Sequence, residues 1–109
     1  MRGNEKIQGL ILKAVKMIVD ATHPQKVILY GSYANGNPTI HSDVDLLVIK
    51  EDNLPRIERS VFIGKILRNL EKELPLDITV YTPSEVKSAL EGGDPFIEDI
   101  LRKGDLLYG

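Results

Sequence analysis

Four residues near the middle of this chain have the types and spacing to bind a nucleotide and metal ions. Gly31 and Ser32 follow an apolar run, and ten residues after Ser32 the pair Asp43 and Asp45 opens a second apolar run. Glycine lacks a Cβ, so its backbone can approach phosphate closely. A helical turn with Ser32 as its N-cap would also direct free N–H groups at an anion. The pattern predicts a phosphate-binding turn beside two carboxylates.

The carboxylates themselves predict a magnesium site. In a β-strand, residues two apart point to one face, which places the backbones of Asp43 and Asp45 roughly 6–7 Å apart. Two divalent ions about 3.5–4 Å apart can hold the attacking and leaving oxygens of a phosphoryl transfer. Magnesium suits this role because it combines carboxylates with water and substrate phosphate. Asp77, near the start of a later apolar run, offers a third carboxylate.

Each half of this pattern has a simpler explanation when it is taken alone. A Gly-Ser pair is a common turn, and Ser42 with Asp43 could be turn residues while Asp45 faces solvent on an edge strand. Both halves at this spacing, between two apolar runs and followed by Asp77, favour the functional interpretation. An EF-hand is excluded, because the further oxygen ligand, glycine and distal glutamate of that calcium loop do not follow Asp43.

Other polar and aromatic residues are weaker candidates. His41 could contact a phosphate or a base, and Lys50 could reach a phosphate, but both fit solvated loop or strand-end positions better. Tyr30 and Tyr81 are expected to pack at strand ends. Tyr33 is expected to be exposed, where it could line a nucleotide pocket.

Composition narrows the class of protein. With 109 residues, the chain is expected to form one domain over residues 1–109. A net charge of -2 without a basic block argues against a broad electrostatic contact with nucleic acid. The absence of cysteine excludes disulfides and zinc–thiolate sites. No apolar run is long enough for a signal peptide or a membrane span, so we expect a cytoplasmic protein.

The elements that would position these residues follow from hydrophobic periodicity, capping residues and prolines. We expect strands at 27–30, 44–49 and 76–81, an edge strand at 106–108, and helices at 5–20, 55–74, 83–91 and 95–103. This order predicts an α/β (α+β) fold, a small mixed sheet with helices on one face. The connection of about 25 residues between the second and third strands permits a parallel crossover, and antiparallel neighbours remain possible.

The helix expected at 55–74 carries a second apolar stripe. Five apolar residues recur at helical spacing, so the sequence predicts that they face the core: Ile57, Val61, Ile66, Leu67 and Leu70. Arg59 falls mostly outside the stripe and is expected to be exposed.

The central residues resemble the minimal nucleotidyltransferase family, within the DNA polymerase beta-like nucleotidyltransferase superfamily. The family pattern of Gly-Ser, ten residues and Asp-x-Asp is matched by Gly31, Ser32, Asp43 and Asp45, and the segment LDITVYTP with Asp77 looks like its third acidic strand. The resemblance spans most of the chain. It implies that the three aspartates bind two magnesium ions, that Asp77 helps to activate the attacking hydroxyl, and that the Gly-Ser pair positions the triphosphate.

The resemblance also implies a partner. Small family members of this kind are encoded beside HEPN-domain toxins, and some transfer AMP from ATP to a tyrosine of the toxin. The resemblance therefore implies an antitoxin-type protein adenylyltransferase with a HEPN-domain partner. Many relatives carry arginine where this chain has Asn35, which keeps hydrogen bonding but loses the charge.

Two alternatives remain open at this point. The chain could be a nucleotidyltransferase-fold binding module of weak activity that neutralises a partner by contact, as the small size and Asn35 suggest. Transfer to a small molecule, as in antibiotic-modifying relatives, is less favoured because little chain is left to build a second substrate pocket.

Overall fold

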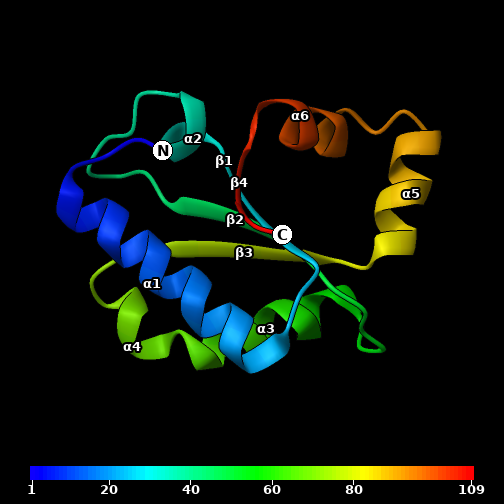
Figure 1. Ribbon diagram of the computed structural model, residues 1–109, viewed down its shortest axis with the longest axis horizontal. Coiled ribbons are helices and arrows are strands. Elements are labelled where there is room, and N and C mark those ends of the chain that lie inside the picture. The colour runs from blue at the N-terminus through cyan, green and yellow to red at the C-terminus, as the bar shows by residue number, and fades with distance from the viewer.

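A four-stranded mixed sheet forms the centre of the computed structural model, which describes residues 1–109 (Figure 1). The sheet has the order β3-β2-β1-β4, with β1 at Lys26–Tyr30, β2 at Val44–Ile49, β3 at Leu76–Tyr81 and β4 at Asp105–Tyr108. β1 is antiparallel to β2 and β4, whereas β2 is parallel to β3. The predicted mixed sheet is confirmed, and the connection from β2 to β3 is a parallel crossover.

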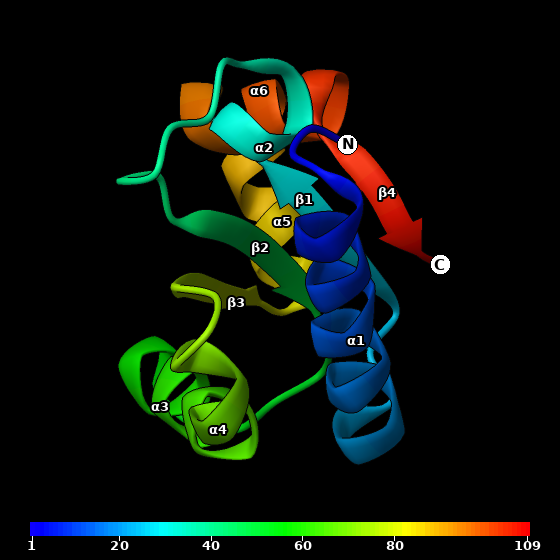
Figure 2. The same cartoon turned by 90° about the vertical axis from the view of Figure 1, so that its left-hand side faces the viewer.

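The helices lie on both faces of this sheet (Figure 2). Those of the first face are α1 at Glu5–Thr22, α3 at Arg56–Ile66 and α4 at Arg68–Glu71, while α5 at Pro83–Glu91 and α6 at Pro95–Lys103 contribute to the second. The short α2, Ser32–Asn35, follows β1 directly. The sequence placed all helices on one face, and α5 and α6 correct that detail.

Two apolar clusters explain the two-sided arrangement. Val44, Leu46 and Val48 point into a core of 17 buried residues with α1, α3 and α4. Leu47 and Ile49 point the other way, into a second cluster of six buried residues that includes two isoleucines of α6. A strand that is apolar at nearly every position needs cover on both faces. The continuous run after Asp45 therefore already carried the signal for helices on the second face.

The helical region after Pro55 differs from the predicted stripe. The helix breaks at Leu67, whose φ of -94° and ψ of 5° separate α3 from α4. The side chains of Ile57 and Val61 are 80% and 52% exposed, whereas Arg59 is only 8% exposed. The predicted burial of Ile57 and Val61 and the predicted exposure of Arg59 are therefore wrong. Arg59 can be buried because groups distant in sequence accept hydrogen bonds from its guanidinium.

Arg59 forms hydrogen bonds with groups in three other parts of the chain. Its Nε donates to the Leu54 carbonyl oxygen at 2.7 Å, and its Nη1 donates to the Val80 carbonyl oxygen at 3.3 Å and to Glu85 at 2.5 Å. Glu85 in turn completes a capping box of α5 with Thr82. Arg59 thus fastens α3 to the end of β3 and to the start of α5, next to the sheet that carries the candidate site.

The remaining ends of the helices follow local sequence signals. Asn4 caps α1 by accepting a hydrogen bond from the Ile7 amide, and His23 ends that helix in the left-handed region at a φ of 48°. None of the helices combines the length and apolar character that crossing a membrane requires.

The Arg59–Glu85 contact predicts an acid-sensitive part of the stability. The hydrogen bond from Arg59 lowers the pKa of Glu85 to about 2 from its ordinary 4.5. A carboxylate with a lowered folded-state pKa contributes stability above its unfolded pKa and loses it as the pH falls. We expect the Glu85 contribution to the free energy of unfolding to disappear between about pH 4.5 and pH 2, as measured by urea unfolding.

Glu85→Gln tests this assignment because glutamine can still form a capping box but carries no charge. The variant should be about 1–2 kcal/mol less stable at pH 7, and the difference from wild type should narrow in acid. Glu58→Gln, at an exposed position of α3, is the control and should keep the wild-type pH dependence. A constant difference across this range would contradict the prediction.

Candidate active site

The turn after β1 brings the chain against an acidic side chain. Gly31 has a φ of 75° and a ψ of -153°, a backbone region that is essentially restricted to glycine. A Cβ at this position would overlap the carboxylate of Asp45. The amides of Ala34 and Asn35 donate to the Gly31 carbonyl oxygen at 3.1 and 3.3 Å, which closes α2 onto the turn. The structure therefore brings the predicted glycine and aspartate into direct proximity.

Ser32 lies at the start of α2, although not as the predicted cap. Gly31 occupies the N-cap position, no side chain caps this helix, and Ser32 is its first residue, with a half-buried side chain. The first amides of a helix have no acceptor within it. The amides of Ser32 and Tyr33 are thus placed at the open end of α2, beside Gly31. The nucleotide-binding role of Gly31 and Ser32 stays a prediction.

Three side chains form a row across the same end of the sheet. Asp45 on β2 pairs with Tyr30 on antiparallel β1 and with Asp77 on parallel β3. Directly paired residues of neighbouring strands share a face, and here it is the face opposite to the larger core. Asp43 lies in the loop just before β2, exposed like Asp77. The structure thus gathers Asp45 and Asp77 on one face, with Asp43 at its edge.

Electrostatics set Asp45 apart from other carboxylates. Burial, followed by the charges of Asp77 and Asp43, raises the pKa of Asp45 from 3.8 to about 6. Like charges that share a site each disfavour ionisation of the other, and a bound cation relieves that repulsion. The charges of Asp77 and Asp43 thus act on Asp45, which is the least exposed of the three carboxylates.

The donor chemistry suits magnesium, although the three carboxylates do not converge on one point. No group of three histidine, cysteine, aspartate or glutamate side chains is placed closely enough to hold a metal ion. Magnesium, however, is usually held by one or two carboxylates, with water and substrate phosphate as further ligands. Asp45 and Asp77 provide such a pair of oxygen donors in adjacent strands. The magnesium ligands Asp43, Asp45 and Asp77 stay a prediction.

Tyr30 belongs to this site, although the sequence suggested only packing at a strand end. Its half-buried ring makes an edge-to-face contact with Phe96 of α6, with ring centroids 5.6 Å apart and planes at 89°. Burial raises the pKa of the Tyr30 hydroxyl, a hydrogen bond with Thr79 lowers it, and the charges of Asp45 and Asp77 raise it further. Tyr33, which was expected to be exposed, is buried at 8% exposure.

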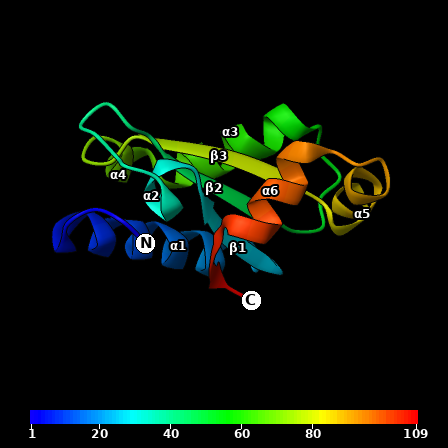
Figure 3. The ribbon, with the colours of Figure 1, turned by 90° about the horizontal axis from the view of Figure 1, so that it is seen from above.

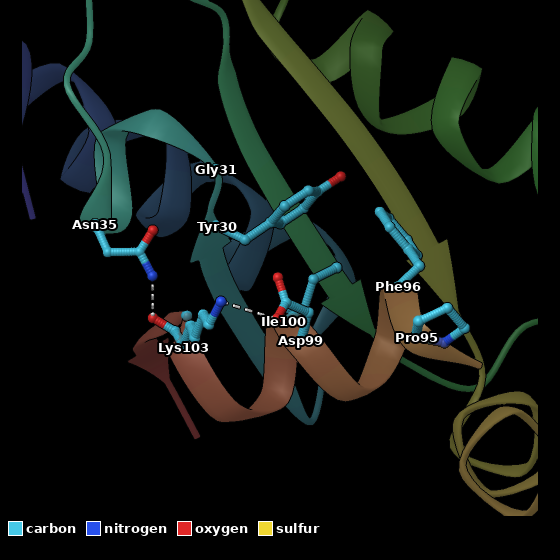
Figure 4. Close-up of a pocket in the computed structure, with 9 residues that line it drawn as sticks. Tyr30, Gly31, Asn35, Pro95, Phe96, Asp99, Ile100 and Lys103 are labelled. Carbon is cyan, nitrogen blue, oxygen red and sulfur yellow. Dashed lines mark hydrogen bonds and ion pairs between the residues drawn. The ribbon is translucent and has the colours of Figure 1, made fainter. Parts of the chain in front are cut away.

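A cavity of about 380 Å³ opens between the Gly31 turn and α6 (Figure 4). Tyr30 and Phe96 give it aromatic walls, and Asn35 and Lys103 lie side by side where α2 meets α6. The sequence predicted α6 but gave none of its residues a role. The signal was absent because the contacts that bring α6 to the turn join residues far apart in the chain.

A family model described as a nucleotidyltransferase domain matches residues 10–107 of this sequence. The chain belongs to the nucleotidyltransferase-domain family. The matched segment contains the Gly31 turn and all three aspartates of the candidate site. The resemblance stated from the sequence motifs is thereby confirmed.

Two relatives illustrate the range of the family. Spectinomycin 9-adenylyltransferase of Staphylococcus aureus is 34% identical over 91 residues, which are 76% of this chain and 35% of that enzyme. This chain therefore spans about a third of the length of that relative. A candidate protein adenylyltransferase of Methanocaldococcus jannaschii is 27% identical over 109 residues, with 99% of both chains covered.

Solved structures show the same fold. A candidate nucleotidyltransferase of Sulfolobus solfataricus has a TM-score of 0.63 at 17% identity, covering 93% of this chain and 78% of that one. A toxin–antitoxin structure with AMP-PNP has a TM-score of 0.61 at 24% identity, covering 89% and 71%. A variant of the toxin–antitoxin MntA–HpeT has a TM-score of 0.55 at 25% identity, covering 99% and 74%. The predicted polymerase beta-like fold is confirmed.

The tight approach of Gly31 to Asp45 predicts a coupled effect of substitution. Gly31→Ala should lower the free energy of unfolding by about 1–3 kcal/mol because alanine is strained in this backbone conformation. The overlap of its Cβ with the Asp45 carboxylate should add a further loss of stability. In an Asp45→Ala background the loss from this overlap should vanish, so Gly31→Ala should cost less stability there. A double-mutant cycle measured by urea unfolding gives the coupling.

Gly93→Ala is the matched control for that cycle. Gly93 also has a positive φ, of 71°, but a Cβ there would meet no atom within 4 Å. Its cost should be the same with and without Asp45→Ala. If Gly31→Ala cost the same in both backgrounds as well, the close approach to Asp45 would not be a constraint on the turn.

The raised pKa of Asp45 predicts that its charge opposes folding of the metal-free protein. The folded-state pKa of Asp45, about 6, exceeds the ordinary value of 3.8. Between these two pH values the folded chain therefore binds more protons than the unfolded chain. The contribution of Asp45 to the free energy of unfolding thus becomes less favourable as the pH rises. In EDTA, Asp45→Asn should therefore be more stable than wild type at pH 7. The gain should shrink as the pH falls from about 6 to below about 4.

Urea unfolding at several pH values measures this gain. Glu91→Gln, at an exposed position near the end of α5, is the control and should leave the stability nearly unchanged over the same range. An Asp45→Asn gain that stays constant with pH would show that the charge of Asp45 is not its source.

Proposed function

We propose that this protein is a magnesium-dependent nucleotidyltransferase that moves AMP from ATP to a hydroxyl group of a partner protein. The observation that carries the proposal is the position of Gly31, whose turn touches Asp45 while Asp45 stands in register with Asp77. A backbone turn with free amides suits a triphosphate, and the adjacent carboxylates suit the metal that a phosphoryl transfer needs.

In the proposed reaction, the residues of this chain hold and orient the reactants. Asp43, Asp45 and Asp77 would hold two magnesium ions, which when bound neutralise phosphate charge and stabilise the attacking and leaving oxygens. Gly31 and Ser32 orient the triphosphate through the start of α2. The acceptor oxygen bonds to the α-phosphorus, the bond to the bridging oxygen breaks, and pyrophosphate leaves. Exposed Asp77 receives the hydroxyl proton.

The choice of acceptor rests on relatives and on exposure. The Methanocaldococcus jannaschii relative, which matches this chain over nearly its whole length, is named as a candidate protein adenylyltransferase. Structures with the same fold come from toxin–antitoxin pairs, one of them with an ATP analogue. Asp43 and Asp77 are exposed, so a macromolecular hydroxyl can approach them. These observations support a HEPN-domain toxin as the partner, with this chain as its antitoxin.

The proposal predicts label transfer to the protein encoded next to this chain, which we expect to be a HEPN-domain toxin. Wild type with labelled ATP and magnesium should label the partner, and EDTA should stop the reaction. Asp45→Asn should slow transfer by about 10²-fold or more, because transition-state charge loses its support. Gel autoradiography and intact-protein mass measure the product. Asp20→Asn, on the exposed side of α1, is the control and should transfer normally. An unlabelled partner would reject this acceptor.

A second candidate function is neutralisation of the partner by contact alone. Two observations support it. The three carboxylates do not converge on one point, and Asn35 is an uncharged amide where many relatives carry a charged arginine. The double variant Asp43→Asn with Asp45→Asn separates the two functions in a toxicity assay. If the folded variant still suppresses the toxin, contact is sufficient, whereas loss of suppression favours the transferase.

A further inference from the structure

We propose that Lys103, in the last turn of α6, binds the outer phosphates of the nucleotide donor and gives the Gly31 turn the cation that it lacks. This inference rests on the proposed function, because it assigns a residue to the triphosphate of that same reaction. No motif in the sequence singles out Lys103, and the assignment comes from the cavity that this residue shares with the turn.

The cavity continues from the Gly31 turn toward α6. Gly31 and Asn35 form one wall, Lys103 lies beside Asn35 on α6, and Lys103 is the one basic residue among the nine that line the cavity (Figure 4). Asp45 lies against Gly31 as well. A donor with its α-phosphate at the carboxylates can therefore extend its β- and γ-phosphates past the glycine into the cavity.

The position of Lys103 is fixed by contacts of its backbone. The Asn35 side-chain amide donates to the Lys103 carbonyl oxygen at 3.1 Å and so ties the ends of α2 and α6 together. Gly104 then lets the chain pass close to β1, since a Cβ there would lie 2.6 Å from both the Ile100 carbonyl oxygen and the Ile28 Cγ2 atom. Figures 1 and 3 show α2 and α6 at the same end of the sheet.

The charge of the protein groups at the site favours such a cation. Asp43, Asp45 and Asp77 are all acidic, and the α2 amides offer only partial positive charge to a triphosphate. Asn35 adds a hydrogen-bond donor without charge. A lysine ammonium on a flexible stem is a common ligand for phosphate. Lys103 lines the same cavity as Gly31 and can supply that charge.

Lys103 can leave its present partner without leaving a carboxylate unpaired. Its Nζ lies 3.3 Å from Asp99 Oδ1, and Arg102 Nη2 binds the same oxygen at 3.2 Å. Both side chains of the Lys103–Asp99 pair are 54% exposed, and exposed ion pairs of this type are weak. Arg102 can therefore keep Asp99 paired while Lys103 turns to a phosphate.

Arg102 provides a matched control within the same helical turn. Both residues are basic, lie at the C-terminal end of α6 where they complement the helix dipole, and pair with Asp99. Only Lys103 lines the cavity. A role limited to stabilising α6 would make the two substitutions equivalent, whereas phosphate binding would separate them.

The experiment measures binding of two nucleotides by calorimetry, with magnesium and without any acceptor. The probes are α,β-methylene ATP, which cannot release pyrophosphate, and AMP, which lacks the outer phosphates. Lys103→Gln should weaken binding of the ATP analogue about tenfold, as expected for loss of one charge-assisted hydrogen bond. AMP binding should stay unchanged, and Arg102→Gln should bind both probes nearly like wild type, because the ion pairs of the exposed Asp99 are weak.

A rescue variant tests the same idea in the opposite direction. Asn35→Arg in the Lys103→Gln background places a guanidinium beside the position of the lost ammonium. Its N–H groups can replace the Asn35 donor to the carbonyl oxygen of residue 103, and the variant should restore most of the lost affinity for the ATP analogue. Urea unfolding of each variant checks that α6 remains folded. Rescue by a charge on another element is a result that a purely structural role of Lys103 would not give.

Three outcomes would overturn the inference. Equal affinities of Lys103→Gln and Arg102→Gln for the ATP analogue would leave Lys103 without a role in binding. Equal weakening of AMP and the ATP analogue would place Lys103 at the nucleoside instead, beside the aromatic pair Tyr30 and Phe96. Failure of the wild type itself to bind the ATP analogue would reject the proposed function, which distinguishes that result from a failure of Lys103 alone.

Discussion

The antiparallel register of β1 and β2 is the constraint on which the candidate site depends. It sets Tyr30 opposite Asp45, so the chain leaves β1 directly above the acidic strand, and the missing Cβ of Gly31 allows the carboxylate to remain there. A slip of one residue would turn every side chain of β2 to the other face. Asp45 would then enter the larger core and Leu46 would face the turn. The register that keeps Asp45 out of the larger core is therefore required for the site as well as for the fold.

The elements of the fold were predictable where local signals decide them. Asn4, His23 and the capping box at Thr82 mark helix ends through contacts within a few residues, and the structure confirms these ends. Side-chain burial in α3 was not predictable in the same way. Arg59 is buried because Val80 and Glu85 satisfy it from other elements, and Ile57 is exposed because no element covers it. Helical periodicity gives the faces of a helix but not which face the sheet will bury.

The residues of the candidate site also fall into those that local sequence predicts and those that it does not. Gly31, Ser32, Asp43 and Asp45 lie within 15 residues of one another, so their spacing shows the pattern without a structure, and the alternation of β3 places Asp77 on the matching face. Tyr30 and the residues of α6 enter the site through packing between distant segments. The hydrogen bond that brings α6 to the turn joins residues 68 positions apart. No pattern within a short window of sequence contains that information.

The parallel crossover between β2 and β3 has a consequence for how the acidic pair comes into being. Asp45 and Asp77 become neighbours only when the intervening helices have packed and closed a long segment, and such non-local closure comes at an entropic cost that local contacts do not bear. Bringing two like charges together adds to that cost. In an unfolded chain Asp45 and Asp77 accordingly have no fixed spacing, and a nascent chain gains this juxtaposition only after β3 has been synthesised and has paired with β2.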